Sequence, residues 1–510
     1  MKIIIPLAST DKEIFENFST IKSLVKLGNK TMIETFVENF KFDYEYIFLC
    51  KKKDLIETNL LSIIQNLKIK KRIIEIKKNT SNVIETVYFA KKYVKDNEQV
   101  LICHPDNINI FFSKQILKNK LIKHNTDGLL FAFDEDNQTN TVETHTGRVI
   151  IKENKFMKII EKSIKTESSK SLVGIYHFSK WSEFLKFSKK TLENQAPVRG
   201  RYFLSQVYNE YLLMKKNIEI FYVKKHITFG LVNYINEYNF WYKYFKKNIK
   251  KKLKLKFNFL NLIPSCGDSL RFKIDNTDNF KPLIQVDKKY MITKTIESLP
   301  LSIKNAAIIR SDHNKKYKFK EKIIKKNKNL EVMILKNKTS GMATTCYEYL
   351  KNYKKKNPIL ISSCDYAVIF DEKKLKDTIN FFNPDVIVWT FKNYPDARLA
   401  PLAYAYCEIQ NGEIIKISEK TTISETPHLD HIAQGIFYFK SKKIFMKAFK
   451  KMVKNKNKVN NEYYVGNSIN ELIKENYRVI PFEVEQYICL GTLQDLKVYN
   501  FWSDCFYDKS

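Results

Sequence analysis

Residues 262–272 read LIPSCGDSLRF, and residues 281–284 read KPLI. An apolar run that ends at a proline and then meets small residues predicts a buried strand entering a loop. The backbone N–H groups of such a loop can approach a phosphate closely. Arg271 and Lys281 add cations that can neutralise charge on a phosphoryl group and its leaving group. We expect a phosphate-binding loop here; the alternative is a strand and turn with an incidental Arg and Lys.

Landmarks of this region occur twice in the chain, in the same order. The IIP at residues 4–6 recurs as LIP at 262–264. The YNFW at residues 238–241 recurs intact at 499–502. Both recurrences lie about 260 residues downstream, and self-similarity at one spacing is the signature of a repeated unit. The sequence therefore predicts two copies of one domain in tandem.

The joint between the copies is a lysine-rich stretch. We expect a first domain over residues 1–245, a basic linker over 246–257 and a second domain over 258–510. In the second copy, apolar runs typical of buried strands alternate with amphipathic stretches typical of helices. The expected strands are 261–264, 306–309, 331–335, 358–362 and 385–389, and the expected helices are 291–299, 343–353 and 374–382. This alternation predicts two tandem Rossmann-like, doubly wound α/β domains with mostly parallel mixed sheets.

The composition excludes several classes of protein. The chain has 510 residues, with 44% hydrophobic and 14% aromatic residues, which excludes a disordered basic tail. Its formal net charge of +34 suggests nucleic-acid binding, but almost all of the basic side chains are lysine rather than the arginine that such proteins favour. The eight cysteines include no C-x-x-C pair, and no apolar run reaches the length of a membrane span. We expect a cytoplasmic protein with reduced thiols that binds no nucleic acid.

A carboxylate follows a second apolar run, because residues 360–365 read LISSCD. An aspartate at a strand tip can hold Mg²⁺ against a phosphate with few other protein ligands. The alternative is an ordinary loop or cap residue. The pattern favours Asp365 as a metal ligand.

These motifs resemble the signature of the sugar-phosphate nucleotidyltransferases, in which G-x-G-[ST]-R-[FM] after a strand is followed by P-K-P-L. This chain departs from it at Ser269, Leu270 and Phe280. The segment TSGMA at 339–343 resembles the segment whose glycine backs the nucleotide base. The resemblance implies the nucleotide-diphospho-sugar transferase type of fold, with Arg271, Lys281 and Asp365 as catalytic residues. The nucleotide-binding residues that it implies are Pro264, Cys266, Gly267, Asp268, Ser269 and Gly341.

The rest of the second copy follows the same family order. The segment IIKISEK at 414–420, with GIFYF at 435–439, resembles the acceptor segment of the family, which implies that Glu419, Lys420 and Gly435 bind the acceptor. Many relatives carry an aspartate as a second metal ligand where this chain has Cys489. The sequence therefore leaves open whether a second metal is held at this position.

The first copy departs further. Its residues 8–15 read ASTDKEIF, with neither glycine nor arginine and with added acid, which should repel a triphosphate. Asn82 stands where the second copy has Gly341. The counterparts that it retains are Lys22, Asp106, Glu161 and Lys162. We expect a degenerate copy used for packing, dimerisation or product binding; a variant site with another donor is the alternative.

The resemblance implies an enzyme of the branch found in capsule and surface-polysaccharide clusters. Such an enzyme couples an NTP, here with a weak preference for CTP, to a sugar 1-phosphate or another small phosphorylated acceptor, uses Mg²⁺ and releases pyrophosphate. The chain could form a homo-oligomer. The first rival is a nucleotide-sugar glycosyltransferase of the same fold, although residues 365–367 lack the usual Asp-x-Asp metal site. The second is a lysine-rich, non-catalytic nucleic-acid-binding or scaffold protein.

Overall fold

The structure, a computed structural model, describes residues 1–8, 11–122, 126–135, 146–153, 155–247, 255–269, 272, 280–327, 329–394, 397 and 400–507. The chain divides into two compact units. Unit 1 comprises Met1–Asn248 with Phe501–Ser510, and unit 2 comprises Ile249–Asn500. The expected domain boundary at residue 245 lies inside helix α9 (Val232–Lys247), and the expected start at 258 lies inside strand β14 (Lys256–Pro264). Much of the expected linker, residues 248–254, lies outside the described residues.

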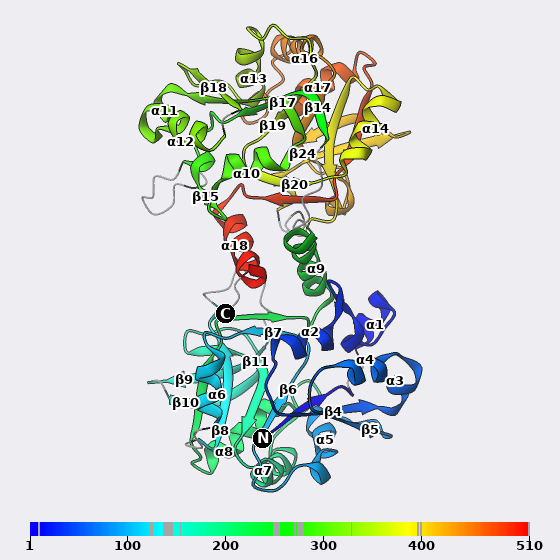
Figure 1. The fold of residues 1–510 in the computed structure, drawn as a ribbon, viewed down its shortest axis with the longest axis vertical. Coiled ribbons are helices and arrows are strands. Elements are labelled where there is room, and N and C mark those ends of the chain that lie inside the picture. The colour runs from blue at the N-terminus through cyan, green and yellow to red at the C-terminus, as the bar shows by residue number, and fades with distance from the viewer. Residues whose placement is uncertain are drawn as a thin grey trace. The chain divides into compact units, whose positions relative to one another are not determined.

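Unit 1 is built on a sheet that has nine strands within the described residues (Figure 1). Its main path runs β10-β9-β11-β6-β1-β4-β5, and β8 joins β12 to β11. Strands β1, β4, β5 and β6 are parallel, whereas β11 runs antiparallel to its neighbours β6, β8 and β9. The strands are β1 (Lys2–Pro6), β4 (Glu45–Lys51), β5 (Lys71–Ile76), β6 (Val100–Cys103), β8 (Gly128–Phe133), β9 (Thr146–Lys152), β10 (Lys155–Ser163), β11 (Ser169–Phe178) and β12 (Ile218–Tyr222).

The sheet of unit 2 also has nine strands among the described residues, and it repeats this order strand for strand. Its path runs β18-β17-β14-β19-β24-β21-β25, with the β22–β23 hairpin paired to β24. The mixed α/β fold expected for the two domains is thus confirmed. Besides β14, the strands are β17 (Leu301–Arg310), β18 (Leu330–Leu335), β19 (Ile359–Ser362), β21 (Val386–Phe391), β22 (Ala405–Gln410), β23 (Glu413–Glu419), β24 (His431–Phe439) and β25 (Val479–Glu483).

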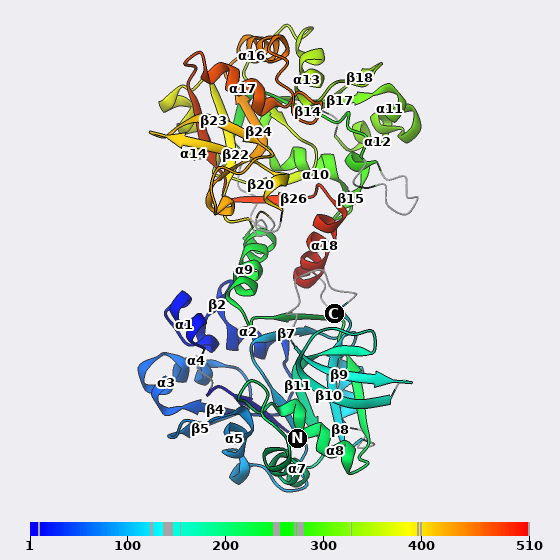
Figure 2. The ribbon, with the colours of Figure 1, turned by 180° about the vertical axis from the view of Figure 1, so that it is seen from behind.

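Helices cover both faces of each sheet, because central strands are apolar on both sides. In β1, Ile3 and Ile5 enter one core cluster and Ile4 enters the other. In unit 2, α16 and α17 lie side by side over one face (Figure 2). The helices of unit 1 are α1 (Lys12–Phe18), α2 (Met32–Asn39), α3 (Lys52–Glu57), α4 (Leu60–Asn66), α5 (Val83–Tyr88), α6 (Lys114–Ile122), α7 (Trp181–Asn194), α8 (Val207–Leu213) and α9. The helices that follow α9 in the chain are α10 (Met291–Ser298), α11 (Ser311–Tyr317), α12 (Phe319–Lys326), α13 (Met342–Leu350), α14 (Glu372–Phe382), α16 (Lys442–Lys454), α17 (Val465–Ile473) and α18 (Leu493–Tyr507).

All five strands expected in the second copy form, and two of them begin five residues earlier than the sequence pattern indicated. β14 starts at Lys256 because Phe257 and Phe259 alternate into the core before the continuous apolar run begins. β17 likewise starts at Leu301. None of the helices in the described part of the chain combines the length and apolar character needed to cross a membrane.

Candidate active site

The phosphate loop expected from the sequence follows β14, where parallel strands β17 and β19 flank it. The N–H group of Ser265 donates to the Ile308 carbonyl oxygen at 2.8 Å, which ties the start of the loop to β17. A Cβ added at Gly267 would meet no described atom within 4 Å, so the backbone there faces open space. Ser269 adopts a φ of 56°, which lies in the left-handed region that glycine adopts most easily. The motif quoted above has a glycine at this position. The loop thus presents backbone at the carboxyl end of the sheet.

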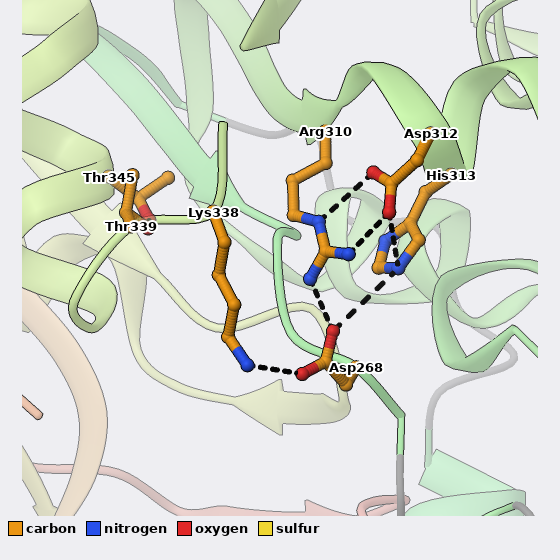
Figure 3. A network of polar contacts seen from close by, with 7 residues as sticks. All are labelled: Asp268, Arg310, Asp312, His313, Lys338, Thr339 and Thr345. Atoms are coloured by element: carbon orange, nitrogen blue, oxygen red, sulfur yellow. Dashed lines mark hydrogen bonds and ion pairs between the residues drawn. The ribbon is translucent and has the colours of Figure 1, made fainter. Parts of the chain in front are cut away.

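An ion-pair network joins Asp268 of this loop to side chains outside it (Figure 3). Asp268 accepts hydrogen bonds from Arg310, at the end of β17, and from Lys338 at 2.5 Å. Arg310 Nε also donates to Asp312 at 3.0 Å, and His313 Nε2 lies 3.9 Å from Asp268. The hydrogen bond from Lys338 and the contacts with Arg310 lower the pKa of Asp268. Without a ligand, the loop carboxylate therefore neutralises two cations beside it.

Sequence reasoning singled out Asp268 but missed Arg310 and Lys338. A signal for Arg310 was available, because it is one of few arginines and directly follows an apolar run. No comparable signal marks Lys338, because lysines are abundant in this chain. Arg271 lies outside the described residues.

Lys281 and Asp365 form an ion pair between the segment after the phosphate loop and the tip of β19. Their side chains are only 21% and 18% exposed. Burial disfavours the charged amine of Lys281, but the carboxylate of Asp365 outweighs it and the pKa of Lys281 is raised. The N–H of Lys281 also donates to Ser269 Oγ at 3.1 Å, and Ser363 Oγ donates to Asp365. Three sequence-predicted residues, Ser269, Lys281 and Asp365, are thus joined by direct contacts.

Gly341 closes the same region from the start of α13. Its φ of 116° and ψ of 174° belong to a region that only glycine readily adopts. The loop before it is bonded to residue 463, because Tyr463 N–H donates to the Ser340 carbonyl oxygen at 2.8 Å. Gly341, the phosphate loop and Lys281 line one cavity of about 560 Å³, which we call the loop cavity.

A second cavity of about 530 Å³ lies at the end of β23 and beside the middle of β24, and we call it the Glu419 cavity. It is lined by Glu419, Lys420, Gly435 and Asp365, together with several aromatic side chains. Burial raises the pKa of Glu419 to about 7, which Lys420 only partly offsets. Lys420 itself has a φ of 59° and donates from Nζ to the Ala403 carbonyl oxygen.

The two cavities adjoin. Met342, Ser363 and Tyr464 line both of them. Asp365 lines the Glu419 cavity, while its ion-pair partner Lys281 lines the loop cavity. Two ligands, one in each cavity, would therefore meet at the Lys281–Asp365 pair.

The residues around Asp365 fit a magnesium ion held in part by substrate. Mg²⁺ commonly binds one or two carboxylates and completes its shell with water and phosphate oxygens, and Asp365 is such a carboxylate. Cys489 donates from Sγ to Asp495 Oδ2 at 3.3 Å. In the part of the chain that the structure describes, no group of three or more His, Cys, Asp or Glu residues could hold a metal alone.

In the corresponding region of unit 1, the charged side chains pair with one another. Lys22 pairs with Asp106 at 2.8 Å and also with Asp11 at 3.5 Å, and Asp11 caps the N-terminus of α1. Helix α1 thus begins within the expected loop segment, and the cavity beside Lys22 and Asp106 is only about 50 Å³. Asn82, which we aligned with Gly341 in the sequence, has a φ of −154° and caps the N-terminus of α5. Residues 9 and 10 lie outside the described residues.

The segment expected to bind the acceptor has similar backbone features in both units. Glu161 is partly exposed and accepts a hydrogen bond from Ser205, and desolvation of its carboxyl group raises its pKa. Lys162 has a φ of 52°, close to that of Lys420, and Gly174 and Gly435 both have positive φ. Unit 1 therefore shares the backbone conformation of this segment with unit 2. Its cavity beside Lys22, however, is much smaller than the loop cavity of unit 2.

No family model matches this chain, and no curated protein does. Among solved structures, the chain is similar to the nucleoside-diphosphate-sugar pyrophosphorylase from Vibrio cholerae RC9, with 18% identity and a TM-score of 0.39, over 48% of this chain and 99% of that one. It is also similar to the inositol-1-phosphate CTP transferase from T. maritima, with 14% identity and a TM-score of 0.39, over 48% of this chain and 94% of that one. At these values the likeness carries no functional argument, so the function has to be argued from the site.

Proposed function

We propose that unit 2 transfers a nucleotidyl group from an NTP to a small phosphorylated acceptor and releases pyrophosphate. The observation that carries this proposal is the pair of adjoining cavities that meet at Lys281 and Asp365. One has a loop of open backbone suited to phosphates, and the other has a buried carboxyl group and aromatic walls suited to a small organic ligand.

The chain's own residues would act by positioning and by charge. The triphosphate would lie against the loop amides around Gly267, with Lys281 and Arg271 neutralising the charge that develops on the leaving pyrophosphate. The acceptor phosphate would enter from the Glu419 cavity and attack the α-phosphorus in line. It is already anionic at neutral pH, so no protein base is needed. Holding both reactants in register can lower the barrier by about 7–11 kcal/mol.

Asp365 is the residue that would hold Mg²⁺. When bound, the ion supplies charge neutralisation between the α-phosphate and the acceptor phosphate. Lys281 pairs with one oxygen of that carboxylate, and Ser363 donates a hydrogen bond to the other. Lys281 also lies where it would contact phosphate oxygens of a nucleotide in the loop cavity.

Further details of the proposal rest on the sequence resemblance. We propose a sugar 1-phosphate or a similar compound as acceptor, CTP as the favoured donor and a cytoplasmic role in making surface-polysaccharide precursors. The two units would be tandem copies of one domain, of which unit 1 is non-catalytic. Its cavity beside Lys22 and Asp106 is about a tenth of the volume of the loop cavity. The Asp11 carboxylate pairs with Lys22, the cation that a phosphate would otherwise contact.

The decisive experiment is a screen of the four NTPs against phosphorylated acceptors, with the full-length protein and pyrophosphate release as the readout. Arg271→Ala and Asp365→Asn should each abolish most turnover while the circular dichroism spectrum stays that of wild type. Asp106→Asn in unit 1 is the matched control and should retain activity. Wild-type rates in Arg271→Ala or Asp365→Asn would overturn the assignment.

Two further measurements would identify the rivals. Release of a nucleoside diphosphate from a nucleotide sugar, without release of pyrophosphate from any NTP, would indicate a glycosyltransferase. Salt-sensitive binding to arbitrary DNA without any NTP-dependent activity would indicate a nucleic-acid-binding protein.

A further inference from the structure

Strand β12 forms an open edge of the sheet in unit 1. Within the part of the chain that the structure describes, β12 pairs with β8 alone, and the N–H of Val223 donates to the Ala132 carbonyl oxygen on that side at 2.9 Å. Successive residues of a strand direct their backbone groups to opposite sides. The N–H and C=O groups of Ile218, Ile220 and Tyr222 therefore point to the open edge. A row of such groups is a template for pairing with another strand.

The equivalent strand of unit 2 carries a proline at the centre of its open edge. Among the described residues, β25 pairs with β21 alone, and the N–H of Val484 bonds it to β21 as the N–H of Val223 bonds β12 to β8. Three residues before each of these valines stand Pro481 in β25 and Ile220 in β12. Proline has no N–H to donate and is one of the residues by which natural edge strands prevent pairing. The edge of unit 2 is thus blocked, whereas unit 1 keeps the donor.

A cavity of about 570 Å³ lies beside β12. Its apolar walls come from β9, β10, α8 and β12, and they consist of Ile151, Phe156, Leu212, Ile218, Ile220 and Tyr222. Ile218 and Ile220 pack against a core cluster but stay partly exposed, and Tyr222 is 40% exposed. One residue of an added strand takes about 160 Å³, from the rise, the strand spacing and the sheet separation. The cavity therefore has room for about three to four residues of such a strand.

The charged side chains at this cavity are already paired. Lys216 forms ion pairs with Asp127 at 3.4 Å and with Glu183 at 2.6 Å. Glu219 pairs with Lys120 at 2.6 Å. The described residues that line the cavity therefore offer no unpaired charge that would attract an acidic or a basic partner. For the same reason they do not repel a second copy of the same surface.

β12 is complementary to itself in the antiparallel direction. With Ile220 opposite Ile220 of a second copy, residues 218, 220 and 222 form hydrogen-bonded pairs, so each open N–H meets a C=O. Ile218 then lies opposite Tyr222, and two apolar side chains face each other. Glu219 is the single charged residue of this strand, and it lies opposite Phe221 rather than another charge.

We propose that β12 of unit 1 pairs antiparallel with β12 of a second copy of this chain, so that the unit 1 sheets of a homodimer are continuous across a two-fold axis. Such an interface uses each edge once and therefore closes at the dimer. Pro481 keeps the equivalent edge of unit 2 from adding further copies. The dimer goes beyond the reaction proposed for unit 2 and does not depend on it.

Sedimentation velocity of the full-length protein, from nanomolar to high micromolar concentration, tests the proposal. Wild type should show a reversible monomer–dimer equilibrium. Ile220→Pro copies unit 2 and removes both central N–H donors, so the dissociation constant should rise at least about 10-fold. Ile220→Val is the matched control, because it keeps the N–H and an apolar side chain, and it should dimerise like wild type. Tyr222→Lys puts a charge on the exposed part of the strand and should weaken the dimer at an unchanged melting temperature; it decides the test if Ile220→Pro melts lower than wild type.

Hydrogen exchange measured by mass spectrometry locates the interface. Peptides that cover residues 217–223 should exchange at least about 10-fold more slowly in the wild-type dimer than in the dilute monomer, because the open amides of β12 become bonded. In Tyr222→Lys the exchange should be the same at both concentrations. Wild type that stays monomeric at high micromolar concentration would overturn the proposal. A dimer that Tyr222→Lys leaves intact, or one that forms without protection of β12, would also overturn it. Pyrophosphate release is measured separately, so the failure of either proposal leaves the other standing.

Discussion

Gly341→Ala and Gly267→Ala form a matched pair, because the same methyl group is added at two sites that line the same cavity. At Gly341, the added Cβ would lie 2.6 Å from the backbone nitrogen and 2.8 Å from the backbone oxygen of Tyr463. These two atoms form hydrogen bonds to Ser340 O and from Ala343 N, at 2.8 Å and 3.1 Å. At Gly267, no described atom lies within 4 Å of the added Cβ. Gly341 is therefore constrained by the fold and Gly267 is not.

The magnitude for Gly341→Ala follows from two contributions. Holding an alanine at a φ of 116° costs about 1–3 kcal/mol. Displacing residue 463 weakens two backbone hydrogen bonds, which adds about 1–3 kcal/mol. Because about 1 kcal/mol shifts the melting temperature of a unit of this size by about 2–4 °C, we expect unit 2 to melt about 5–20 °C lower.

The assay is differential scanning calorimetry of the full-length variants, together with KM for the NTP. Gly267→Ala should melt within about 2 °C of wild type, since it is an exposed loop substitution, but its KM for the NTP should rise at least 10-fold because the methyl group enters the space of the phosphates. A Gly341→Ala protein that melts like wild type would refute the reasoning from backbone strain. A Gly267→Ala protein with the wild-type KM would show that the loop does not contact the nucleotide.

Three further predictions address charge in the site. Asp365→Asn should lower kcat by at least about 100-fold, the usual effect of losing one preorganised electrostatic contact, in a steady-state pyrophosphate assay; a loss smaller than 10-fold would remove Asp365 from the reaction centre. The folded protein keeps Glu419 protonated up to about pH 7, whereas the unfolded carboxyl ionises near pH 4.5, so wild-type stability should fall by about 3 kcal/mol as pH rises through this window. Urea unfolding of Glu419→Gln at pH 5, 6, 7 and 8 should lack that fall, and equal pH profiles would contradict the burial of this carboxyl group. Asp268→Asn removes the carboxylate that forms an ion pair with Lys338, so that Lys338 can bind a phosphate instead. KM for the NTP should therefore decrease by about 5-fold, or about 1 kcal/mol; an increase in KM would show that Asp268 serves mainly to hold the loop.

Much of the fold was accessible from local patterns in the sequence. Continuous apolar runs predicted the central strands of unit 2, because strands buried on both faces contain few polar residues. The pattern failed at strand ends: the first part of β14 alternates through Phe257 and Phe259 and does not read as a continuous run. The recurrence of short motifs at one spacing indicated the common strand order of the two units, since equivalent residues come at equivalent points of the same topology.

The sequence by itself determined which residues follow the apolar runs, and therefore that Gly267 and Asp365 would come directly after strands. Only the tertiary structure decided which of them meet. The contacts of Asp268 with Arg310, and of Lys281 with Asp365, join segments that are adjacent because β17 and β19 both flank β14.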